Sequence, residues 1–233
     1  MIIVMQGRVR STRLPGKGFF TFFGQTVWER MCDIALAVGG VKEVVFATGD
    51  LPENHLIRPI VESKGVRFFA GSEDNVLERY CQAVEGSDAD YLIRLTCDNY
   101  LVQPQVIEGL AAAVRAAGGD YGFVEPRSHF AGEVVRLSAL RECWLTGRYS
   151  DLAREHVTWD IRQSPSTRRV ALPADYLGLD HGRSLTLDTI EDLIRMKGLE
   201  AQAPDLRPVR CLEALRRVMA PGYSGVGEAH AAH

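Results

Sequence analysis

Short apolar runs alternate with longer amphipathic stretches through the first half of the chain, and this alternation constrains the fold more than any other feature. The apolar runs cover residues 2–5, 44–47, 66–69 and 91–95. Between them, apolar side chains recur at helical spacing, as Val27, Met31 and Ile34 do. Short runs separated by helical stretches are typical of βαβ units, in which successive strands pair in parallel. We therefore predict an α/β fold with a mostly parallel sheet flanked by helices.

The second half of the chain departs from this alternation. We interpret residues 125–137 as an inserted loop or hairpin and residues 140–161 as mainly helical. Residues 169–172 and 185–187 are predicted to form two further short strands. The segment Thr189–Asp192 then has the Thr-x-x-Asp spacing of a capping box, which favours the start of another helix.

We expect a single domain over residues 1–220, because no internal repeat or linker divides the chain. Within it, residues from about 125 to 165 form the inserted hairpin and helical excursion. From residue 221 onward Gly, Ala, Ser and His dominate, so residues 221–233 are expected to be a disordered tail.

The composition excludes several classes of protein. Hydrophobic residues make up 46% and charged residues 24% of the chain, which excludes a disordered or fibrous protein. The net charge of −3 gives no general attraction to nucleic acid or to anionic membranes. The five cysteines are widely spaced, and we expect reduced thiols. Since no charged leader and no long apolar segment is visible, we expect a soluble cytoplasmic protein that binds neither nucleic acid nor a membrane.

A basic segment follows the first predicted strand. Arg8, Arg10, Arg13 and Lys17 place four cations within ten residues of a slightly acidic chain. In an open parallel sheet, ligands bind beyond the carboxyl ends of the strands, where this segment lies. Glycines let backbone N–H groups approach phosphate oxygens, and the cations neutralise phosphate charge. The spacing matches neither a P-loop nor a dinucleotide fingerprint, and a solvated surface loop is the alternative interpretation.

Two aspartates stand after apolar runs. Asp98 closely follows residues 91–95, and Asp188 follows residues 185–187. Since the carboxyl ends of parallel strands meet at one edge of the sheet, both are expected near the basic segment. Mg²⁺ in proteins takes one or two carboxylates together with phosphate oxygens and water. Asp98 and Asp188 could therefore supply the carboxylates of a magnesium site; the alternative for each is the N-cap of a helix.

The basic segment resembles the phosphate-binding signature of the sugar-acid cytidylyltransferases, the group that contains CMP-Kdo synthetase, CMP-sialic acid synthetase and SpsF-like proteins. That signature reads approximately Ala-Arg-x-x-Ser-x-Arg-Leu-Pro-Gly-Lys. The matching residues are Arg8, Ser11, Arg13, Leu14, Pro15, Gly16 and Lys17. Gly7 stands where the family usually has Ala. The resemblance implies a Rossmann-like sheet of the nucleotide-diphospho-sugar transferase type.

The same resemblance implies roles for individual residues. Lys17 would stabilise charge on the α-phosphate and the departing pyrophosphate, and Asp98 and Asp188, in Thr96-Cys97-Asp98 and Thr186-Leu187-Asp188, would hold the metal. Cys97 replaces the family's usual Gly. The predicted catalytic residues are Lys17, Arg8, Asp98 and Asp188. The predicted nucleotide-binding residues are Arg8, Ser11, Arg13, Gly16, Lys17, Ser72, Arg94 and Thr96.

Two further segments extend the resemblance. Residues 71–80 resemble the SpsF-like sequence Gly-Ser-Glu-Asp-Asp-Val-Leu-Asp-Arg-Tyr, which lies near the nucleoside in the family. Ser72 would contact the base or ribose there, unless the segment is only a capped helix start served by Asp74. Residues 154–158 match the family's Arg-Glu-His-Val-Thr on the acceptor side. His156 would contact the acceptor or have a structural role.

The implied reaction is a nucleotidyl transfer. An acceptor oxygen attacks the α-phosphorus of CTP in line and pyrophosphate leaves, with Mg²⁺ as cofactor and CTP as co-substrate. We predict a small anionic acceptor, because the second half of the chain is rich in arginine, which suits forked contacts with carboxylate or phosphonate groups. These arginines are surface residues in the alternative interpretation. The resemblance implies either a sugar acid or a phosphonate such as phosphonoformate, since members of the family and their relatives activate such acids. The predicted acceptor-binding residues are Arg127, His129, Glu133, His156 and Arg162.

Two other functions compete with this one. A non-catalytic nucleotide-binding subunit on the same scaffold has no need of Lys17, Asp98 and Asp188, which this chain retains. An NAD-dependent oxidoreductase shares the α/β pattern but requires a glycine fingerprint that does not follow the first strand here. We also expect a homodimer. The aromatic run over residues 19–23 is either a dimer surface or part of the core.

Overall fold

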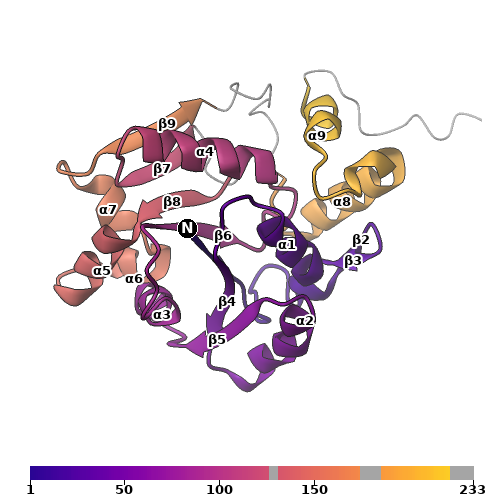
Figure 1. The fold of residues 1–233 in the computed structure, drawn as a ribbon. Coiled ribbons are helices and arrows are strands. Elements are labelled where there is room, and N and C mark those ends of the chain that lie inside the picture. The colour runs from indigo at the N-terminus through magenta and orange to yellow at the C-terminus, as the bar shows by residue number, and fades with distance from the viewer. Residues whose placement is uncertain (126–130, 174–184, 221–233) are drawn as a thin grey trace, which may run out of the picture.

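In the computed structural model, which describes residues 1–125, 131–173 and 185–220, seven strands form one sheet in the order β5-β4-β1-β6-β8-β7-β9 (Figure 1). The strands are β1 (Ile2–Gln6), β4 (Glu43–Gly49), β5 (Arg67–Gly71), β6 (Tyr91–Thr96), β7 (Tyr121–Glu125), β8 (Glu133–Arg136) and β9 (Arg169–Pro173). A separate antiparallel pair joins β2 (Thr21–Phe22) to β3 (Gln25–Thr26). The five strands expected over residues 2–5, 44–47, 66–69, 91–95 and 169–172 are confirmed.

The sheet is mostly parallel, as predicted. β1 pairs in parallel with β4 and β6, β4 with β5, and β7 with β9. β8 runs antiparallel to both of its neighbours, β6 and β7. The chain moves from β1 outward to β4 and β5 and then returns to place β6 on the other side of β1. This reversal opens a crevice at the carboxyl ends of β1 and β6, which is where open α/β sheets bind ligands.

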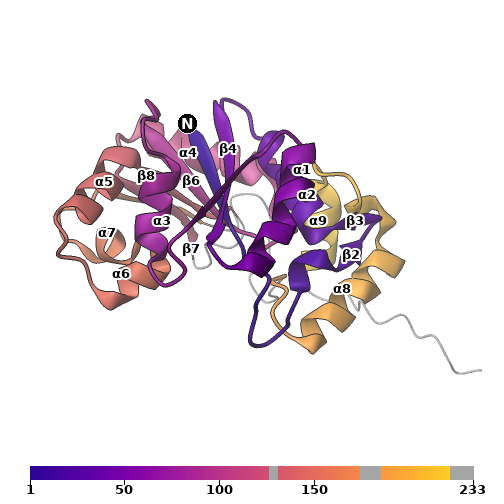
Figure 2. The same cartoon turned by 90° about the horizontal axis from the view of Figure 1, so that it is seen from below.

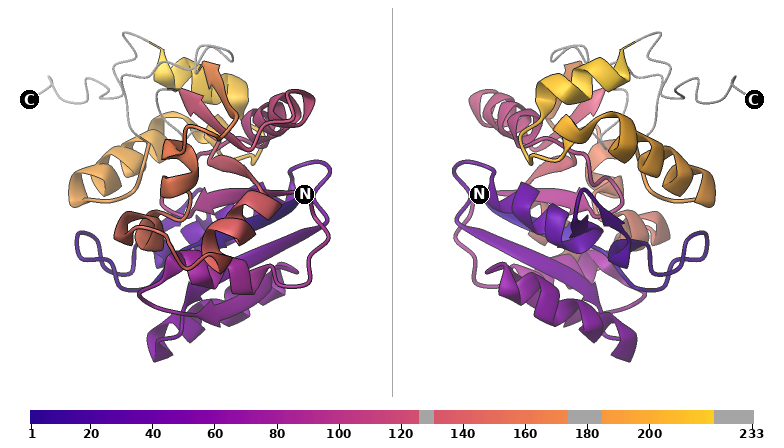
Figure 3. Two further views of the ribbon diagram at one scale, coloured as in Figure 1. Left: turned by 90° about the vertical axis from the view of Figure 1, so that its left-hand side faces the viewer. Right: turned by 90° about the vertical axis from the view of Figure 1, so that its right-hand side faces the viewer.

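Each face of the sheet is covered by its own hydrophobic core. Alternate residues of β1 point to opposite faces, so Ile3 and Met5 enter one core while Ile2 and Val4 enter the other. The first core holds α1 (Val27–Leu36), α2 (Arg58–Ser63), α4 (Pro104–Ala116), α8 (Ile190–Gln202) and α9 (Leu212–Met219). The second core holds α3 (Val76–Ala83), α5 (Leu137–Leu145), α6 (Asp151–His156) and α7 (Trp159–Gln163). Figure 2 and Figure 3 show the two groups of helices on opposite sides of the strands.

The described part of the excursion predicted for residues 125–165 contains one strand, β8, and three helices. β7 and β8 are antiparallel neighbours, and α5, α6 and α7 follow β8 without another strand among the described residues. Residues 126–130, which carry the predicted acceptor residues Arg127 and His129, lie outside the described part of the chain. The tail expected over residues 221–233 also lies outside it.

The strand predicted over residues 185–187 is wrong. The structure has no ladder there, and the backbone N–H of Leu187 donates to the carbonyl of Asp98 over 2.9 Å. Asp98 lies beyond the end of β6, so a strand has no neighbouring edge with which to pair. This backbone bond, and a bond of 2.9 Å from the Thr186 hydroxyl to the side-chain oxygen of Asn99, nevertheless hold Asp188 beside Asp98. The capping box that follows is confirmed: Thr189 caps α8 and bonds reciprocally with Asp192.

The aromatic run over residues 19–23 belongs to the first core. Phe22 and Phe23 are buried, and Phe19 and Phe20 are half-buried against the same cluster. Core packing, one of the two interpretations of the run, is therefore confirmed. All five cysteines are unpaired. In the described part of the chain no helix is both long and apolar enough to cross a membrane. Two 3₁₀ helices matter below: η1 (Lys17–Phe19) and η2 (Pro52–Ile57).

Candidate active site

A cavity of about 510 Å³ opens at the carboxyl ends of β1 and β6. Gln6 and Thr96, the last residues of these two strands, are register partners and both line it. The walls come from the basic turn, defined here as residues 7–18, and from α3 and α6. The cavity therefore lies at the crevice where the order of strands reverses, as the sequence predicted for a ligand site.

The basic turn is closed by its own backbone. The N–H of Gly16 donates to the carbonyl of Val9 over 3.0 Å, and the hydroxyl of Ser11 accepts from the N–H of Leu14 over 3.3 Å. Gly16 has a φ of +70°, a left-handed conformation that favours glycine. Gly16 thus turns the chain so that Lys17 enters η1 at the cavity. Ser11 lines the cavity, whereas Gly16 is not among its lining residues.

Two glycines of the basic turn make room for a tryptophan. Trp28 is 1% exposed, and a Cβ at Gly7 or Gly18 would come within 2.5 Å or 1.8 Å of its ring. These distances are shorter than real Cβ atoms ever approach other heavy atoms, so both positions require glycine while Trp28 is present. This explains why Gly7 replaces the alanine that is usual in the resembling signature.

The central feature of the site is one ammonium between two carboxylates. Lys17 Nζ lies 2.6 Å from Asp188 Oδ1 and 3.2 Å from Asp98 Oδ2. The guanidinium of Arg13 donates to the other oxygen of Asp188 over 2.9 Å. The side chain of Lys17 is only 15% exposed, so water screens these contacts weakly. The basic turn and both aspartates, predicted from segments far apart in sequence, do meet at the cavity.

The two aspartates suit a magnesium ion. Asp98 Oδ1 is buried and has no hydrogen-bond partner among the described residues, which is unusual for a carboxylate oxygen. Across the described ranges no group of three or more His, Cys, Asp or Glu side chains could hold a metal. Mg²⁺ does not need such a cage, because it takes one or two carboxylates and completes its shell with phosphate oxygens and water. Asp98 and Asp188 beside an open cavity fit that requirement.

The remaining arginines of the basic turn pair with carboxylates, of which Glu73 lines the cavity and Glu53 does not. Arg8 lies 3.6 Å from Glu73, and Arg10 is paired with Glu53 of η2. More than half of each arginine side chain is exposed, so these ion pairs contribute little to the free energy of folding. Both arginines are free to exchange their carboxylate partners for an anionic ligand.

Arg79 was not predicted as a site residue, although it lies within the matched segment 71–80. It lines the cavity from α3, is 6% exposed, and donates to the carbonyl of Ser72 over 2.7 Å. Its Nε is buried without a partner, and no carboxylate of the described residues forms an ion pair with it. Burial lowers the pKa of this guanidinium. A buried cation without a counter-ion is costly unless a ligand supplies the negative charge.

Ser72 has a structural contact. Its hydroxyl accepts from the N–H of Asn75 over 3.0 Å, and Asn75 in turn caps α3 by accepting from the N–H of Glu78. The capped helix start that we considered for this segment is therefore present, with Asn75 as the cap in place of Asp74. Ser72 does not line the cavity, whereas Asp74 does.

Arg94 and Glu133 lie behind the cavity and not in its wall. Glu133 is 3% exposed and accepts from Arg94 over 2.7 Å, from the Tyr121 hydroxyl over 2.5 Å and from the Thr158 hydroxyl over 3.0 Å. Burial by itself raises the pKa of Glu133, but the charge of Arg94 and these hydrogen bonds outweigh it and lower the pKa overall. Thr96 lines the cavity, and its hydroxyl accepts from Asn99.

His156 and Arg162, two of the predicted acceptor-binding residues, do not line the cavity, although neighbours of His156 do. Arg154 and Glu155 of α6 line the cavity, but His156, the next residue, does not; its ring lies 6.2 Å from that of Trp159. Arg162 packs over Trp159 with 4.3 Å between the guanidinium carbon and the ring centre. The sequence singled out His156 within the matched segment and not Arg154 or Glu155, because which side of a six-residue helix faces the cavity cannot be read from the spacing alone.

Comparison with known proteins gives consistent results. The sequence model of a family described as "Cytidylyltransferase" matches residues 1–206. The chain is 29% identical over 228 residues to the spore coat polysaccharide biosynthesis protein SpsF of Bacillus subtilis, covering 93% of this chain and 94% of that one. It is 38% identical over 120 residues to a 3-deoxy-manno-octulosonate cytidylyltransferase of Maricaulis maris, covering 50% of this chain and 45% of that one.

Solved structures share the fold. A cytidylyltransferase from Leptospira borgpetersenii superimposes with a TM-score of 0.79 at 22% identity, over 93% of both chains. The CMP:2-keto-3-deoxy-manno-octonic acid synthetase complexed with CTP superimposes with a TM-score of 0.64 at 19% identity, over 86% of this chain and 98% of that one. The Rossmann-like architecture expected from the sequence is confirmed by these neighbours.

Proposed function

Because this chain belongs to the cytidylyltransferase family and is therefore a nucleotidyltransferase, we propose that it transfers CMP from CTP to a small anionic acceptor and releases pyrophosphate. The observation that carries the proposal is the ammonium of Lys17 between Asp98 and Asp188 at the mouth of the crevice. A half-buried lysine held beside two carboxylates supports the proposal, because a metal-bound triphosphate needs both signs of charge at one place.

The basic turn supplies the phosphate contacts. Arg8 and Arg13 have exposed guanidinium groups whose carboxylate partners a triphosphate can replace, and forked N–H donors match phosphate oxygens. Lys17 is the first residue of η1, and its ammonium lies between the two aspartates proposed to hold the metal. Their contribution is to orient the triphosphate and to stabilise the charge that develops on the α-phosphate and on pyrophosphate.

Asp98 and Asp188 are the proposed ligands of Mg²⁺. When bound, the ion would neutralise phosphate charge and polarise the α-phosphate. The unpartnered Oδ1 of Asp98 supports this assignment, since a carboxylate oxygen that is buried and unsatisfied is stabilised by a cation. The backbone bond from Leu187 to Asp98 keeps the two carboxylates together without the ion.

The acceptor is proposed to be a sugar acid or a phosphonate such as phosphonoformate. The name of the Maricaulis relative, a 3-deoxy-manno-octulosonate cytidylyltransferase, supports a sugar acid. Arg154 on α6 lines the cavity and offers a cation to either kind of acid. The acceptor roles of Arg127, His129, Glu133, His156 and Arg162 stay predictions, as does the homodimer.

A matrix of nucleotides and acceptors tests the proposal. Pyrophosphate release is measured with CTP, UTP, ATP and GTP, each with Mg²⁺ and with 3-deoxy-manno-octulosonate, a sialic acid, phosphonoformate or a neutral sugar. We expect release with CTP and an anionic acceptor, and none after the divalent cation is chelated. Binding of CTP without release under any condition would instead support a non-catalytic subunit, and release only with a neutral sugar would contradict an anionic acceptor.

A further inference from the structure

Gln6 connects the cavity to the buried groups behind it. It is the last residue of β1, lines the cavity, and its side-chain oxygen accepts from Arg94 Nε over 3.1 Å. A guanidinium nitrogen can only donate, so the atom that faces Arg94 is the amide oxygen. The amide nitrogen therefore points away from Arg94. Among the described residues it has no hydrogen-bond partner, which leaves two N–H donors for the cavity.

Arg94 is itself held in place. Its NH1 donates to Glu133 over 2.7 Å while its Nε donates to Gln6, so the two contacts use different edges of one planar fork. Glu133 cannot turn away, because hydroxyls from Tyr121 on β7 and from Thr158 next to α7 also donate to it. The orientation of the fork is thus fixed by three separate elements.

These groups form a row across the sheet that is direct from Glu133 to Arg94 and diagonal from Arg94 to Gln6. Arg94 is the register partner of Val4 on β1 and of Glu133 on β8, and Gln6 lies two residues beyond Val4 on the same face. Side chains two residues apart on a strand point to the same side. The row therefore leads from the buried carboxylate of Glu133 through Arg94 to the amide of Gln6 at the cavity.

We propose that the amide nitrogen of Gln6 donates a hydrogen bond to an oxygen atom of the bound nucleotide, and that Arg94 and Glu133 are positioning residues that hold the amide in this orientation. The inference rests on the proposed function in taking CTP as the ligand. The sequence predicted that Arg94 contacts the nucleotide and that Glu133 contacts the acceptor. In this inference both residues instead act on the nucleotide by orienting Gln6.

The substitution Gln6→Glu tests the two contacts of the amide separately, because it keeps the one to Arg94 and removes the proposed one to the nucleotide. The new carboxylate keeps an oxygen for Arg94 but presents a second, negatively charged oxygen to the cavity in place of the N–H donors. We expect the melting temperature to be equal to or above that of the wild type, because the oxygen facing Arg94 gains charge. We expect the Kd for CTP, measured calorimetrically with Mg²⁺ and no acceptor, to rise at least about tenfold.

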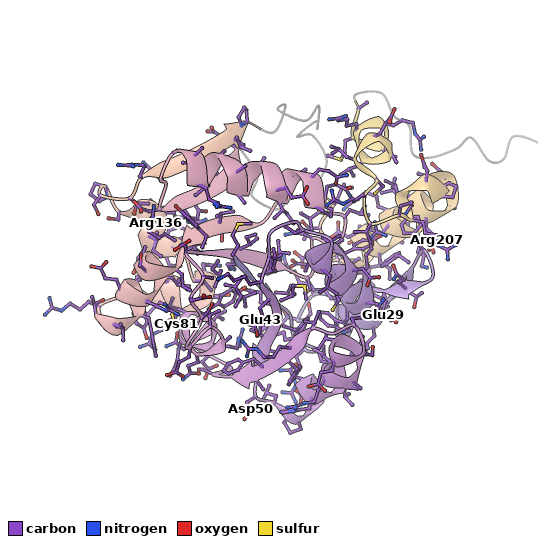
Figure 4. All side chains as sticks on the ribbon, viewed as in Figure 1. Glu29, Glu43, Asp50, Cys81, Arg136 and Arg207 are labelled. Atoms are coloured by element: carbon purple, nitrogen blue, oxygen red, sulfur yellow. The ribbon has the colours of Figure 1, made fainter. Side chains whose placement is uncertain are left out.

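A double-mutant cycle tests the positioning. Arg94→Lys keeps a charge opposite Glu133 but cannot contact both partners, so we expect the Kd for CTP to rise about three- to fivefold. In a Gln6→Ala background the same substitution should change the Kd by less than about twofold, since the group it positions is gone. Glu133→Gln is a second route if Arg94→Lys fails to fold. Arg136→Gln is the matched control. Arg136, labelled in Figure 4, forms an ion pair with Asp120 and lies opposite Tyr91, at the end of β6 that is away from the cavity.

The outcomes are distinguishable. CTP binding by Gln6→Glu within about twofold of the wild type would overturn the inference, and so would an effect of Arg94→Lys that is equally large in both backgrounds. A wild-type protein that does not bind CTP at all would overturn the proposed function, and this inference with it. Equal weakening by Arg136→Gln and Arg94→Lys would show that only general stability is at work, which also contradicts the positioning role.

Discussion

Lys17 is the residue on which the site depends most. Its ammonium separates two carboxylates, and its removal leaves Asp98 and Asp188 facing each other with Arg13, on Asp188, as the only counter-ion among the described residues. For Lys17→Met we expect turnover to fall by about 10²-fold or more, as for other losses of a transition-state charge contact. We also expect Mg²⁺ to raise the melting temperature more than in the wild type, because the ion no longer competes with the ammonium.

The control for this substitution is Lys42→Met. Lys42 also forms a short ion pair, with Asp88, but at an exposed place away from the cavity. Its loss should leave turnover and the response to Mg²⁺ unchanged. Turnover in Lys17→Met within about threefold of the wild type would contradict the role given to Lys17.

Gly7 packs directly against the ring of Trp28, so the effects of substitutions at the two positions depend on each other. A Cβ at position 7 meets the indole at 2.5 Å, so Gly7→Ala should lower the free energy of unfolding by about 1–3 kcal/mol, the usual cost of overpacking. In a Trp28→Leu background the same change should cost much less, because the ring that it meets is gone. Urea unfolding measures both. Gly39→Ala is the control, since a Cβ there has only an ordinary contact at 3.5 Å. Equal costs of Gly7→Ala in the two backgrounds would contradict the coupling.

At the scale of elements, Glu133 joins β6, β7, β8 and the start of α7. The pKa of its carboxyl is lowered in the folded state despite burial, so the ionised form contributes stability that is fully present above the ordinary glutamate pKa. That contribution is lost as the pH falls through the lowered folded-state pKa. We therefore expect Glu133→Gln to flatten the dependence of the free energy of unfolding on pH in the acidic range.

The matched control for that measurement is Glu213→Gln on α9, where the glutamate is exposed. Its pH profile should follow that of the wild type. If Glu133→Gln and the wild type lost stability with the same slope between about pH 5 and pH 3, the carboxylate would not be held ionised by its neighbours.

The sequence could predict those elements that are determined by residues close together in the chain. Strands β1, β4, β5 and β6 are marked by compact apolar runs, and the capping box at Thr189 depends on residues three positions apart. The segment 185–187 has the same apolar pattern as a strand, yet whether it pairs depends on an edge supplied by distant chain. The pattern could place Asp188 at the right edge of the sheet but could not show that bonds from Thr186 and Leu187 to the loop that follows β6 hold it there.

At the scale of the whole molecule, both cores share one sheet, and we propose that they unfold together. The chain has three tryptophans: Trp28 lies in the first core, and Trp144 and Trp159 pack against the second. Variants that retain only Trp28, or only Trp144 and Trp159, report each core by fluorescence. We expect the same urea midpoint from both after correction for the stability of each variant. Different midpoints would show two units that unfold separately and contradict a single domain.

The site shows the same division between local and distant causes. The resemblance of residues 8–17 and of the two aspartate motifs identified Lys17, Asp98 and Asp188, since each motif is continuous in the sequence. The motifs around Arg79 and Arg154 were found, but which side chain in each faces the cavity depends on helix orientation. No sequence motif pointed to Gln6. Its proposed role depends on the register of β1, β6 and β8, which only the folded sheet brings together.

The central claim is that the basic turn, Asp98 and Asp188 hold one magnesium-bound nucleotide between them. The most direct test is the Kd for CTP, measured calorimetrically with and without Mg²⁺. We expect Mg²⁺ to tighten binding to the wild type at least about tenfold, and Asp98→Asn or Asp188→Asn each to remove most of that gain. Asp50→Asn is the control, because Asp50 also follows a strand of the sheet, β4, but is exposed and paired with His55 (Figure 4). A full magnesium effect in both Asp98→Asn and Asp188→Asn would contradict the account.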